Sequence, residues 1–366
     1  MKTHTYSLLA AAAACGITFG AETAYTTPVG YVTLAVPASG DTNIGQPLQR
    51  PSEYAGAASS VVTSTIGIST SALTSGQFVY APPAQTNSYY LRITGSVVSS
   101  LVGRFFEVVG NTANSITVDT NLAALGFATG DKFTITPYWT LGTLFSAGAG
   151  VGASTDELEP VAFVSFVNFS AAGANKAAAA TYFYYQGVGL SGSGWYNNDN
   201  TALGKQNDLT LEPFQIAIIR NLEATAKSVV VSGVVPAAKT ESSVYGKTVL
   251  NDNYLCIQMP VDVTLGQSGL LASGAVITST DELEPVDFVS TYNETASQFN
   301  KAASKTYFHY TGTGLSGTGW YDNDNTAAGK QDNVVTLKAG RQILIRKSPL
   351  GANAVAPNLT PIPYSL

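Results

Sequence analysis

The sequence predicts an all-β protein, with an N-terminal β-sandwich or small barrel followed by two duplicated β-sandwich-like modules. Three observations support this fold class. Residues 154–208 recur 125 positions later as residues 279–333, with 37 of the 55 aligned residues identical, and a repeat at fixed spacing indicates a repeated structural unit. Short runs of β-branched and aromatic residues alternate with turns along the chain. No long stretch has the 3.6-residue apolar period of an amphipathic helix.

Residues 25–148 are expected to form the N-terminal β domain. Strand-like runs occur at residues 29–36, 89–94, 105–109, 115–118 and 132–136. Turn-forming pairs, Gly110-Asn111 and Gly130-Asp131, precede two of these runs, and glycine and asparagine favour turns because they tolerate positive φ. Closely spaced strands separated by such turns favour a sandwich or a small barrel.

Each repeat is expected to begin with an acidic loop and continue as strands. Repeat module 1 is placed at 149–235, linking strands plus repeat module 2 at 236–350, and an extended C-terminal tail at 351–366. Ser154 and Glu157 fit a capping box for one helical turn, which Pro160 would end. Further expected elements are strands at 161–167, 181–185 and 214–220, their copies at 286–292, 306–310 and 341–347, and a short helix at 171–180.

The first 20 residues are expected to be a signal peptide. A polar start is followed by an apolar run over residues 6–19 and by small residues before a cleavage site after Gly20. A lipoprotein signal ending at Cys15 is the alternative. If cleavage falls after Gly20, the mature chain keeps one cysteine, Cys256, which lies in a strand-like run and is expected to be a buried core residue. This pattern predicts an exported protein, either extracellular, at the cell surface or periplasmic.

The composition narrows the range of partners. Charged residues make up 11% of the chain and the net charge is −6, which argues against nucleic acid because phosphate binding requires clustered Lys and Arg. After signal cleavage no segment reaches the ~18 apolar residues of a transmembrane helix. The expected partners are therefore other copies of the chain or cell-surface glycans.

The most similar part of the repeat is a glycine-rich loop followed by aromatics. Residues 187–192 and 312–317 match G-x-G-x-x-G, but no helix pattern follows, so a dinucleotide site is not expected. The aromatics that follow are candidate sugar-stacking residues for a carbohydrate-binding protein; they are Trp195, Tyr196, Trp320 and Tyr321. The alternative is that these rings anchor the glycine-rich loop on the sheet.

The Asn/Asp-rich loop after these aromatics is a candidate calcium site. Oxygen-bearing residues stand at positions 1, 3, 5 and 12 of a calcium-like loop in both copies; they are Asn197, Asp199, Thr201, Asp208, Asp322, Asp324, Thr326 and Asn333. Calcium takes six to eight oxygen ligands. However, alanine replaces the usual glycine at position 6 and the bidentate glutamate is absent. Side-chain hydrogen bonds to the turn backbone are the alternative, and no other cofactor is expected.

No catalysis is expected from the sequence. The mature chain would keep a single histidine, His309, and a single cysteine, which excludes Cys/His zinc spacing and leaves little room for histidine catalysis. A glycoside-acting enzyme using loop carboxylates such as Glu157 and Glu282 is an alternative, and it would need two carboxyl groups about 5–10 Å apart.

Four short motifs together carry a family resemblance. They are residues 27–32 (TPVGYV), 103–114 (GRFFEVVGNTAN), 130–133 (GDKF) and 139–142 (WTLG). In this combination the chain resembles a family of secreted, β-rich verrucomicrobial proteins. The resemblance covers most of the mature chain and implies export and β architecture, without catalytic residues.

These observations favour an exported structural or adhesive protein of the cell envelope or exterior, built from duplicated β modules. Low charge, duplication and many strand edges able to pair between subunits support this interpretation. A carbohydrate-binding protein and a glycoside-acting enzyme remain the alternatives.

Overall fold

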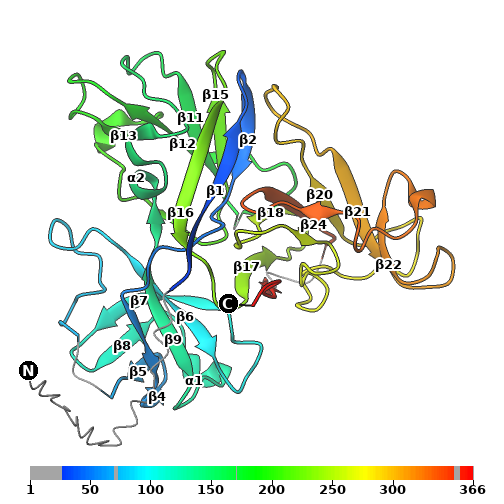
Figure 1. The fold of residues 1–366 in the computed structure, drawn as a ribbon, viewed down its shortest axis with the longest axis horizontal. Coiled ribbons are helices and arrows are strands. Elements are labelled where there is room, and N and C mark those ends of the chain that lie inside the picture. The colour runs from blue at the N-terminus through cyan, green and yellow to red at the C-terminus, as the bar shows by residue number, and fades with distance from the viewer. Residues whose placement is uncertain (1–26, 70–72, 170, 350–354, 366) are drawn as a thin grey trace, which may run out of the picture.

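The protein is represented by a computed structural model that describes residues 27–69, 73–169, 171–349 and 355–365. The regular secondary structure consists almost wholly of antiparallel strands, which confirms the predicted all-β class. The expected leader, residues 1–20, lies outside the described residues. Figure 1 shows three bodies: one at the lower left with β4 to β9, one at the top with β11 to β13, and one at the right with β20 to β22.

The body at the lower left is an inserted domain, residues 51–138. It has one seven-stranded sheet with the order β3-β9-β6-β7-β8-β5-β4. In β7, Phe106 and Val108 are buried while Glu107 and Val109 are exposed, as the two-residue period of a strand requires. Its elements are β3 (Tyr54–Ala57), β4 (Ser60–Val62), β5 (Thr65–Gly67), β6 (Tyr89–Gly95), β7 (Phe105–Asn111), β8 (Ser115–Val118), α1 (Leu122–Leu125) and β9 (Lys132–Pro137).

The body at the top is lobe 1, residues 29–49 and 139–235. Its main sheet has the order β13-β12-β11-β15-β2, formed by β2 (Gly40–Ile44), β11 (Ala162–Val167), β12 (Ala178–Tyr185), β13 (Gly194–Asn197) and β15 (Ala217–Asn221). Two strand pairs complete it: β1 (Val29–Val36) with β16 (Lys227–Val234), and β10 (Trp139–Thr140) with β14 (Thr210–Leu211). The short helix α2 (Leu141–Leu144) begins at a capping box formed by Thr140 and Thr143.

The body at the right is lobe 2, residues 240–349 and 355–365, and it has the same arrangement of strands. The order of its main sheet is β22-β21-β20-β24-β18, while β17 pairs with β25 and β19 with β23. Its strands are β17 (Thr240–Tyr245), β18 (Asn251–Cys256), β19 (Val263–Thr264), β20 (Phe288–Thr291), β21 (Lys305–Tyr310), β22 (Gly319–Asp322), β23 (Thr336–Leu337), β24 (Gln342–Lys347) and β25 (Val355–Thr360).

Strand β2 takes the place in lobe 1 that β18 takes in lobe 2. Asp41 of β2 lies opposite Arg220 of β15, and Asp252 of β18 lies opposite Arg346 of β24. The N-terminal domain is therefore shorter than the expected residues 25–148, because β1, β2 and β10 pair with strands of lobe 1. The partners of β1 and β2 lie far along the chain, so local patterns carry no trace of the pairing.

The chain leaves lobe 1 before the inserted domain and returns to it afterwards at an adjacent point. The Arg50 guanidinium donates to the carbonyl of Tyr138 at 3.0 Å, and the Trp139 indole donates to the carbonyl of Leu48 at 3.0 Å. The two ends of the insertion are thus held side by side, and lobe 1 continues across it.

Three local expectations are wrong or incomplete. Residues 155–159 form an irregular loop instead of a helical turn, and the Ser154 hydroxyl accepts the N–H of Val161 at 3.0 Å. The expected helix at 171–180 is a loop followed by the start of β12, because tertiary pairing overrides the helix propensity of alanine. Part of the expected extended tail forms β25, which pairs with β17.

Candidate functional site

The two lobes meet where β2 and β18 lie at the edges of their sheets. The N–H of Asp41 donates to the carbonyl of Gln298 at 2.9 Å, and the N–H of Asp252 donates to the carbonyl of Gly173 at 3.0 Å. Gln298 and Gly173 are equivalent positions of the repeat, 125 residues apart. The same contact is therefore made once in each direction, as expected for two lobes related by an approximate two-fold axis.

Two asparagines extend this reciprocal contact. The N–H of Asn175 in lobe 1 donates to Asp252 of lobe 2 at 2.7 Å, and the N–H of Asn300 in lobe 2 donates to Asp41 of lobe 1 at 2.7 Å. Both asparagines have a positive φ, 52° and 51°, and asparagine is among the few non-glycine residues that tolerate this region. Each lobe thus inserts one loop against the other.

Two arginines neutralise the aspartates at these contacts. Arg220 binds Asp41 through two hydrogen bonds of 2.8 Å, and Arg346 binds Asp252 through two of 2.7 and 2.9 Å. The side-chain hydrogen bond to aspartate raises the pKa of each guanidinium. Paired N–H donors on both carboxylate oxygens are the strongest form of this interaction, so these aspartates are fixed and compensated.

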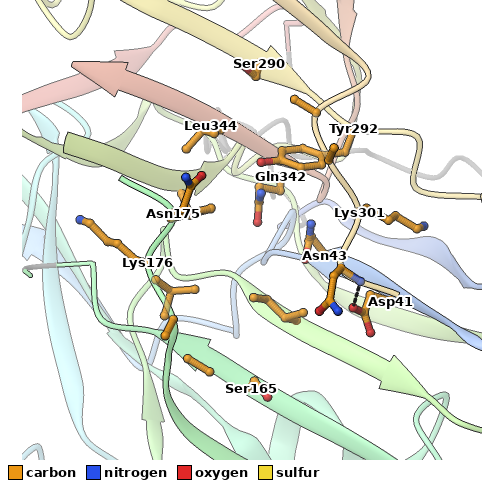
Figure 2. Close-up of a pocket in the computed structure, with 18 of the residues that line it drawn as sticks. Asp41, Asn43, Ser165, Asn175, Lys176, Ser290, Tyr292, Lys301, Gln342 and Leu344 are labelled. Atoms are coloured by element: carbon orange, nitrogen blue, oxygen red, sulfur yellow. Dashed lines mark hydrogen bonds between the residues drawn. The ribbon is translucent and has the colours of Figure 1, made fainter. Parts of the chain in front are cut away.

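A cleft of about 990 Å³ lies between the lobes at this axis (Figure 2). Its lining consists largely of residue pairs at equivalent positions of the two lobes. The pairs with identical side chains are Phe163 and Phe288, Ser165 and Ser290, Asn175 and Asn300, Lys176 and Lys301, Ala177 and Ala302, Ala178 and Ala303, Thr181 and Thr306, Asn198 and Asn323, and Arg220 and Arg346.

The cleft also contains two lysines in matched surroundings. Lys176 donates to the carbonyl of Phe169 at 3.1 Å, and Lys301 donates to the carbonyl of Glu294 at 3.0 Å. Burial lowers the pKa of Lys176 to about 8 and also lowers the pKa of Lys301, because an ammonium ion loses solvation when it is withdrawn from water. Each lysine is therefore held by its own lobe beside the cleft.

The two halves of the cleft differ in aromatic content. Lobe 2 contributes Tyr254 and Tyr292, whereas the equivalent positions in lobe 1 are Asn43 and Val167. Burial raises the pKa of Tyr292, so its hydroxyl stays protonated and able to donate at neutral pH. Figure 2 shows the Tyr292 ring close to Gln342, on the side of lobe 2. This half can provide both a flat apolar surface and polar groups.

The four sugar-stacking candidates lie elsewhere, in the lobe cores. Trp195, Tyr196, Trp320 and Tyr321 are each exposed by 1% or less. The hydroxyls of the two tyrosines donate to the carbonyls of Gly192 and Gly317, both at 2.6 Å. A ring buried to this extent presents no face to a sugar, so stacking at these residues is ruled out in this conformation. The other interpretation of these residues is the one that fits: the aromatic rings anchor the glycine-rich loops on the sheet.

The calcium candidates form turn hydrogen bonds. Asn197 accepts the N–H of Asp199 at 2.8 Å, and Asp322 accepts the N–H of Asp324 at 3.0 Å. Asp322 also forms an ion pair with Lys305 at 2.7 Å, so this carboxylate already has a cationic partner. Thr201 and Thr326 begin short 3-10 turns, while Asp208 and Asn333 are exposed. Within the described residues no group of three or more His, Cys, Asp or Glu side chains gathers to hold a metal.

Two aspartates of the acidic loops that carry the glycosidase candidates Glu157 and Glu282 have local roles. Asp156 and Asp281, which lie beside Glu157 and Glu282, each accept the N–H of the residue two positions later at 2.8 Å. Such contacts stabilise the acidic loop itself. Cys256 is buried, as expected, and burial raises the pKa of its thiol to about 12.

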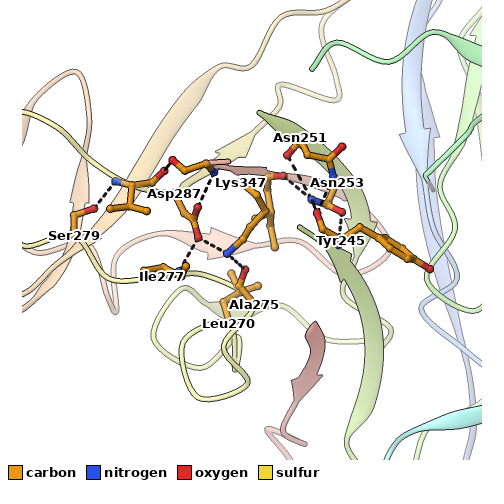
Figure 3. Close-up of polar contacts among 12 residues, drawn as sticks. Tyr245, Asn251, Asn253, Leu270, Ala275, Ile277, Ser279, Asp287 and Lys347 are labelled. Carbon is orange, nitrogen blue, oxygen red and sulfur yellow. Dashed lines mark hydrogen bonds and ion pairs between the residues drawn. The ribbon is translucent and has the colours of Figure 1, made fainter. Parts of the chain in front are cut away.

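Lobe 2 has a second polar cluster, in its interior (Figure 3). Lys347 forms an ion pair with Asp287, and both side chains are almost completely buried, exposed by 3% and 0%. Asp287 also accepts the N–H of Ile277 at 2.7 Å, and Lys347 donates to the carbonyl of Ala275 at 3.0 Å. The pair is enclosed and fully engaged with lobe 2, so it is a structural element and does not face the cleft.

Comparisons with protein-family models, curated proteins and solved structures find no match for this chain. Among the described residues, no helix has the length and apolar character needed to cross a membrane. The sequence does not single out the cleft residues, because they lie on separate strands and loops of both repeats and come together only where the lobes meet. The available signal was identity between the copies at polar positions: Asn-Lys-Ala-Ala occurs at both 175–178 and 300–303.

Proposed function

We propose that this protein is an adhesive protein of the cell envelope or exterior that binds a polysaccharide in the cleft between lobes 1 and 2. The observation that carries the proposal is the cleft itself, where both lobes contribute the same polar side chains. A volume of about 990 Å³ lies at the upper end of the range for small-ligand sites, roughly 300–1,000 Å³. Several sugar units of a longer chain would fit such a space.

The chemistry of the lining supports a sugar ligand. Amides of Asn198, Asn323 and Gln342 and the hydroxyls of Tyr254 and Tyr292 supply donors and acceptors. Tyrosine also offers a large apolar face with a polar tip. These groups complement the hydroxyls and the apolar faces of sugar rings.

A bulky residue in the cleft tests the proposal. Ala178 and its neighbour Ala179 lie on the same strand and are both exposed, but only Ala178 lines the cleft. We expect Ala178→Trp to abolish binding to polysaccharides in affinity electrophoresis and calorimetry, because the indole would fill the space that the ligand needs. Ala179→Trp is the matched control and should bind like the unmodified protein. Equal binding by both variants would show that the cleft is not the binding site.

A further inference from the structure

The cleft has a local excess of positive charge although the whole chain has a net charge of −6. Of the charged groups that line it, Arg220 and Arg346 are each paired with an aspartate. Lys176 and Lys301 remain, and each is bonded to a backbone carbonyl, which is uncharged. The nearby carboxylate of Glu294 is bonded to Thr42 and to the N–H of Asn43, and it faces Arg341 as well as Lys301. The cleft and its immediate surroundings therefore contain two more cationic than anionic side chains, and Lys176 and Lys301 account for this excess.

The two lysines lie at opposite edges of the cleft, where a ligand long enough to span it would reach both. An ammonium group has three N–H donors, and the carbonyl bond accounts for one of them in each lysine. Lys176 follows Asn175 and Lys301 follows Asn300, and these asparagines are fixed by the reciprocal contacts with the other lobe. Figure 2 shows Lys176 and Lys301 at opposite edges of the cleft, with their ammonium groups directed away from each other. The lobes therefore hold two cationic groups in a defined arrangement.

We propose that the polysaccharide bound in the cleft is acidic, and that Lys176 and Lys301 each bind a carboxylate or sulfate group on it. This inference rests on the proposed function, since it names the class of ligand for the same cleft. Neutral amides and tyrosines around the lysines contact the sugar hydroxyls and rings. An acidic polymer matches both features, because its charged groups recur along a chain of hydroxyl-rich rings.

The test compares four polymers at low salt: dextran, dextran sulfate, polygalacturonate and polyglutamate. The unmodified protein should bind dextran sulfate or polygalacturonate at least about tenfold more tightly than dextran, as expected for two added charge contacts. The variant Lys176→Gln/Lys301→Gln should lose this preference, and Lys176→Arg/Lys301→Arg should retain most of it. Comparing the sulfated with the carboxylated polymer identifies the preferred anion.

The repeat provides a matched control. Lys205 and Lys330 are also equivalent lysines, they are exposed, and they do not line the cleft. Lys205→Gln/Lys330→Gln changes the net charge by the same amount and should alter the affinity less than twofold. Circular dichroism and thermal melts of all variants verify that each one is folded.

The outcomes separate the two proposals. If Ala178→Trp abolishes binding but Lys176→Gln/Lys301→Gln keeps the preference for acidic polymers, the role of the lysines is wrong and the cleft remains the site. If binding is insensitive to Ala178→Trp, both proposals fail. If the control lysine variant loses as much affinity as the cleft variant, the preference reflects net charge and the inference is overturned. Binding of polyglutamate as tight as that of the acidic polysaccharides would also overturn it.

Discussion

At the residue scale, the buried ion pair of lobe 2 has an uncharged counterpart in lobe 1. The positions equivalent to Asp287 and Lys347 are Ala162 and Asn221. Asn221 is fully buried and donates to the carbonyls of Pro37 and Thr225, both at 2.9 Å. The same site in the fold is thus filled once by an ion pair and once by an alanine and an amide.

This difference predicts a measurable coupling. Asp287→Ala should reduce the free energy of unfolding by about 3–5 kcal/mol, because it leaves the ammonium of Lys347 buried without its partner. The double variant Asp287→Ala/Lys347→Asn, which copies lobe 1, should lose only about 1–2 kcal/mol. Urea unfolding of both single variants and of the double variant measures the coupling. A double variant as unstable as the sum of the singles would contradict the prediction.

A second prediction concerns the pH dependence of binding. Burial lowers the pKa of Lys176 to about 8, while the nearby Asp252 carboxylate raises it and Lys247 lowers it further. An anionic ligand needs the ammonium form, so affinity should be full about one pH unit or more below the pKa and should start to fall as the pH approaches 8. Above pH 8 binding must also take up a proton, and affinity should fall by up to roughly tenfold per pH unit.

Calorimetry with polygalacturonate at pH 7, 8 and 9 measures this dependence. Lys176→Gln/Lys301→Gln should bind weakly, with little change across the same range, because it lacks the titrating groups. A flat profile for the unmodified protein would refute the titration of Lys176 in the site.

Residue-level patterns identified the core better than the candidate site. The sequence allows two interpretations of the Trp-Tyr pairs, as anchors of the glycine-rich loops or as sugar-stacking residues. Their burial agrees with the first and shows that the second is wrong. Identity between the copies has two causes that a single sequence cannot separate: packing, as at Trp195, and a shared surface, as at Lys176. Only the spatial relation between the lobes distinguishes them.

At the element scale, strands were predicted well where the alternation was local. Strand β1 was expected at 29–36 and is found at Val29–Val36. Strand β2 was missed, although it completes the sheet of lobe 1. Between β2 and β18 only the aspartate is shared at equivalent positions, Asp41 and Asp252. A short edge strand carries too few residues for such similarity to stand out, so the repeat in the sequence is shorter than the repeat in the structure.

At the scale of the whole molecule, the inserted domain is expected to be dispensable for the folding of the two lobes. Its ends are adjacent at Arg50 and Tyr138, and its seven strands pair only with one another among the described residues. Replacing residues 51–138 by a short Gly/Ser linker should give a folded protein that retains polysaccharide binding. Circular dichroism, size exclusion and the binding assay measure this outcome.

The deletion of residues 51–138 is compared with a smaller deletion, of residues 27–44, which removes β1 and β2. We expect this variant to aggregate, because β15 and β16 would each lose a partner strand and expose backbone hydrogen-bonding groups. If the shorter deletion is tolerated while the longer one prevents folding, the assignment of β1 and β2 to lobe 1 as essential strands is contradicted.

Because lobe 1 is built from two segments of the chain, its strands and those of the inserted domain can find their partners only in a certain order during synthesis. The inserted domain contains all of its own strand partners and can fold once residue 137 has emerged. Strand β1 must wait for residues 227–234, which form its partner β16. At roughly 5–20 residues per second, β1 and β2 remain unpaired for about 5–20 s beside a domain that is already folded. The first strands to leave the ribosome are therefore among the last in lobe 1 to be paired, and the nascent chain is most vulnerable to mispairing in this interval.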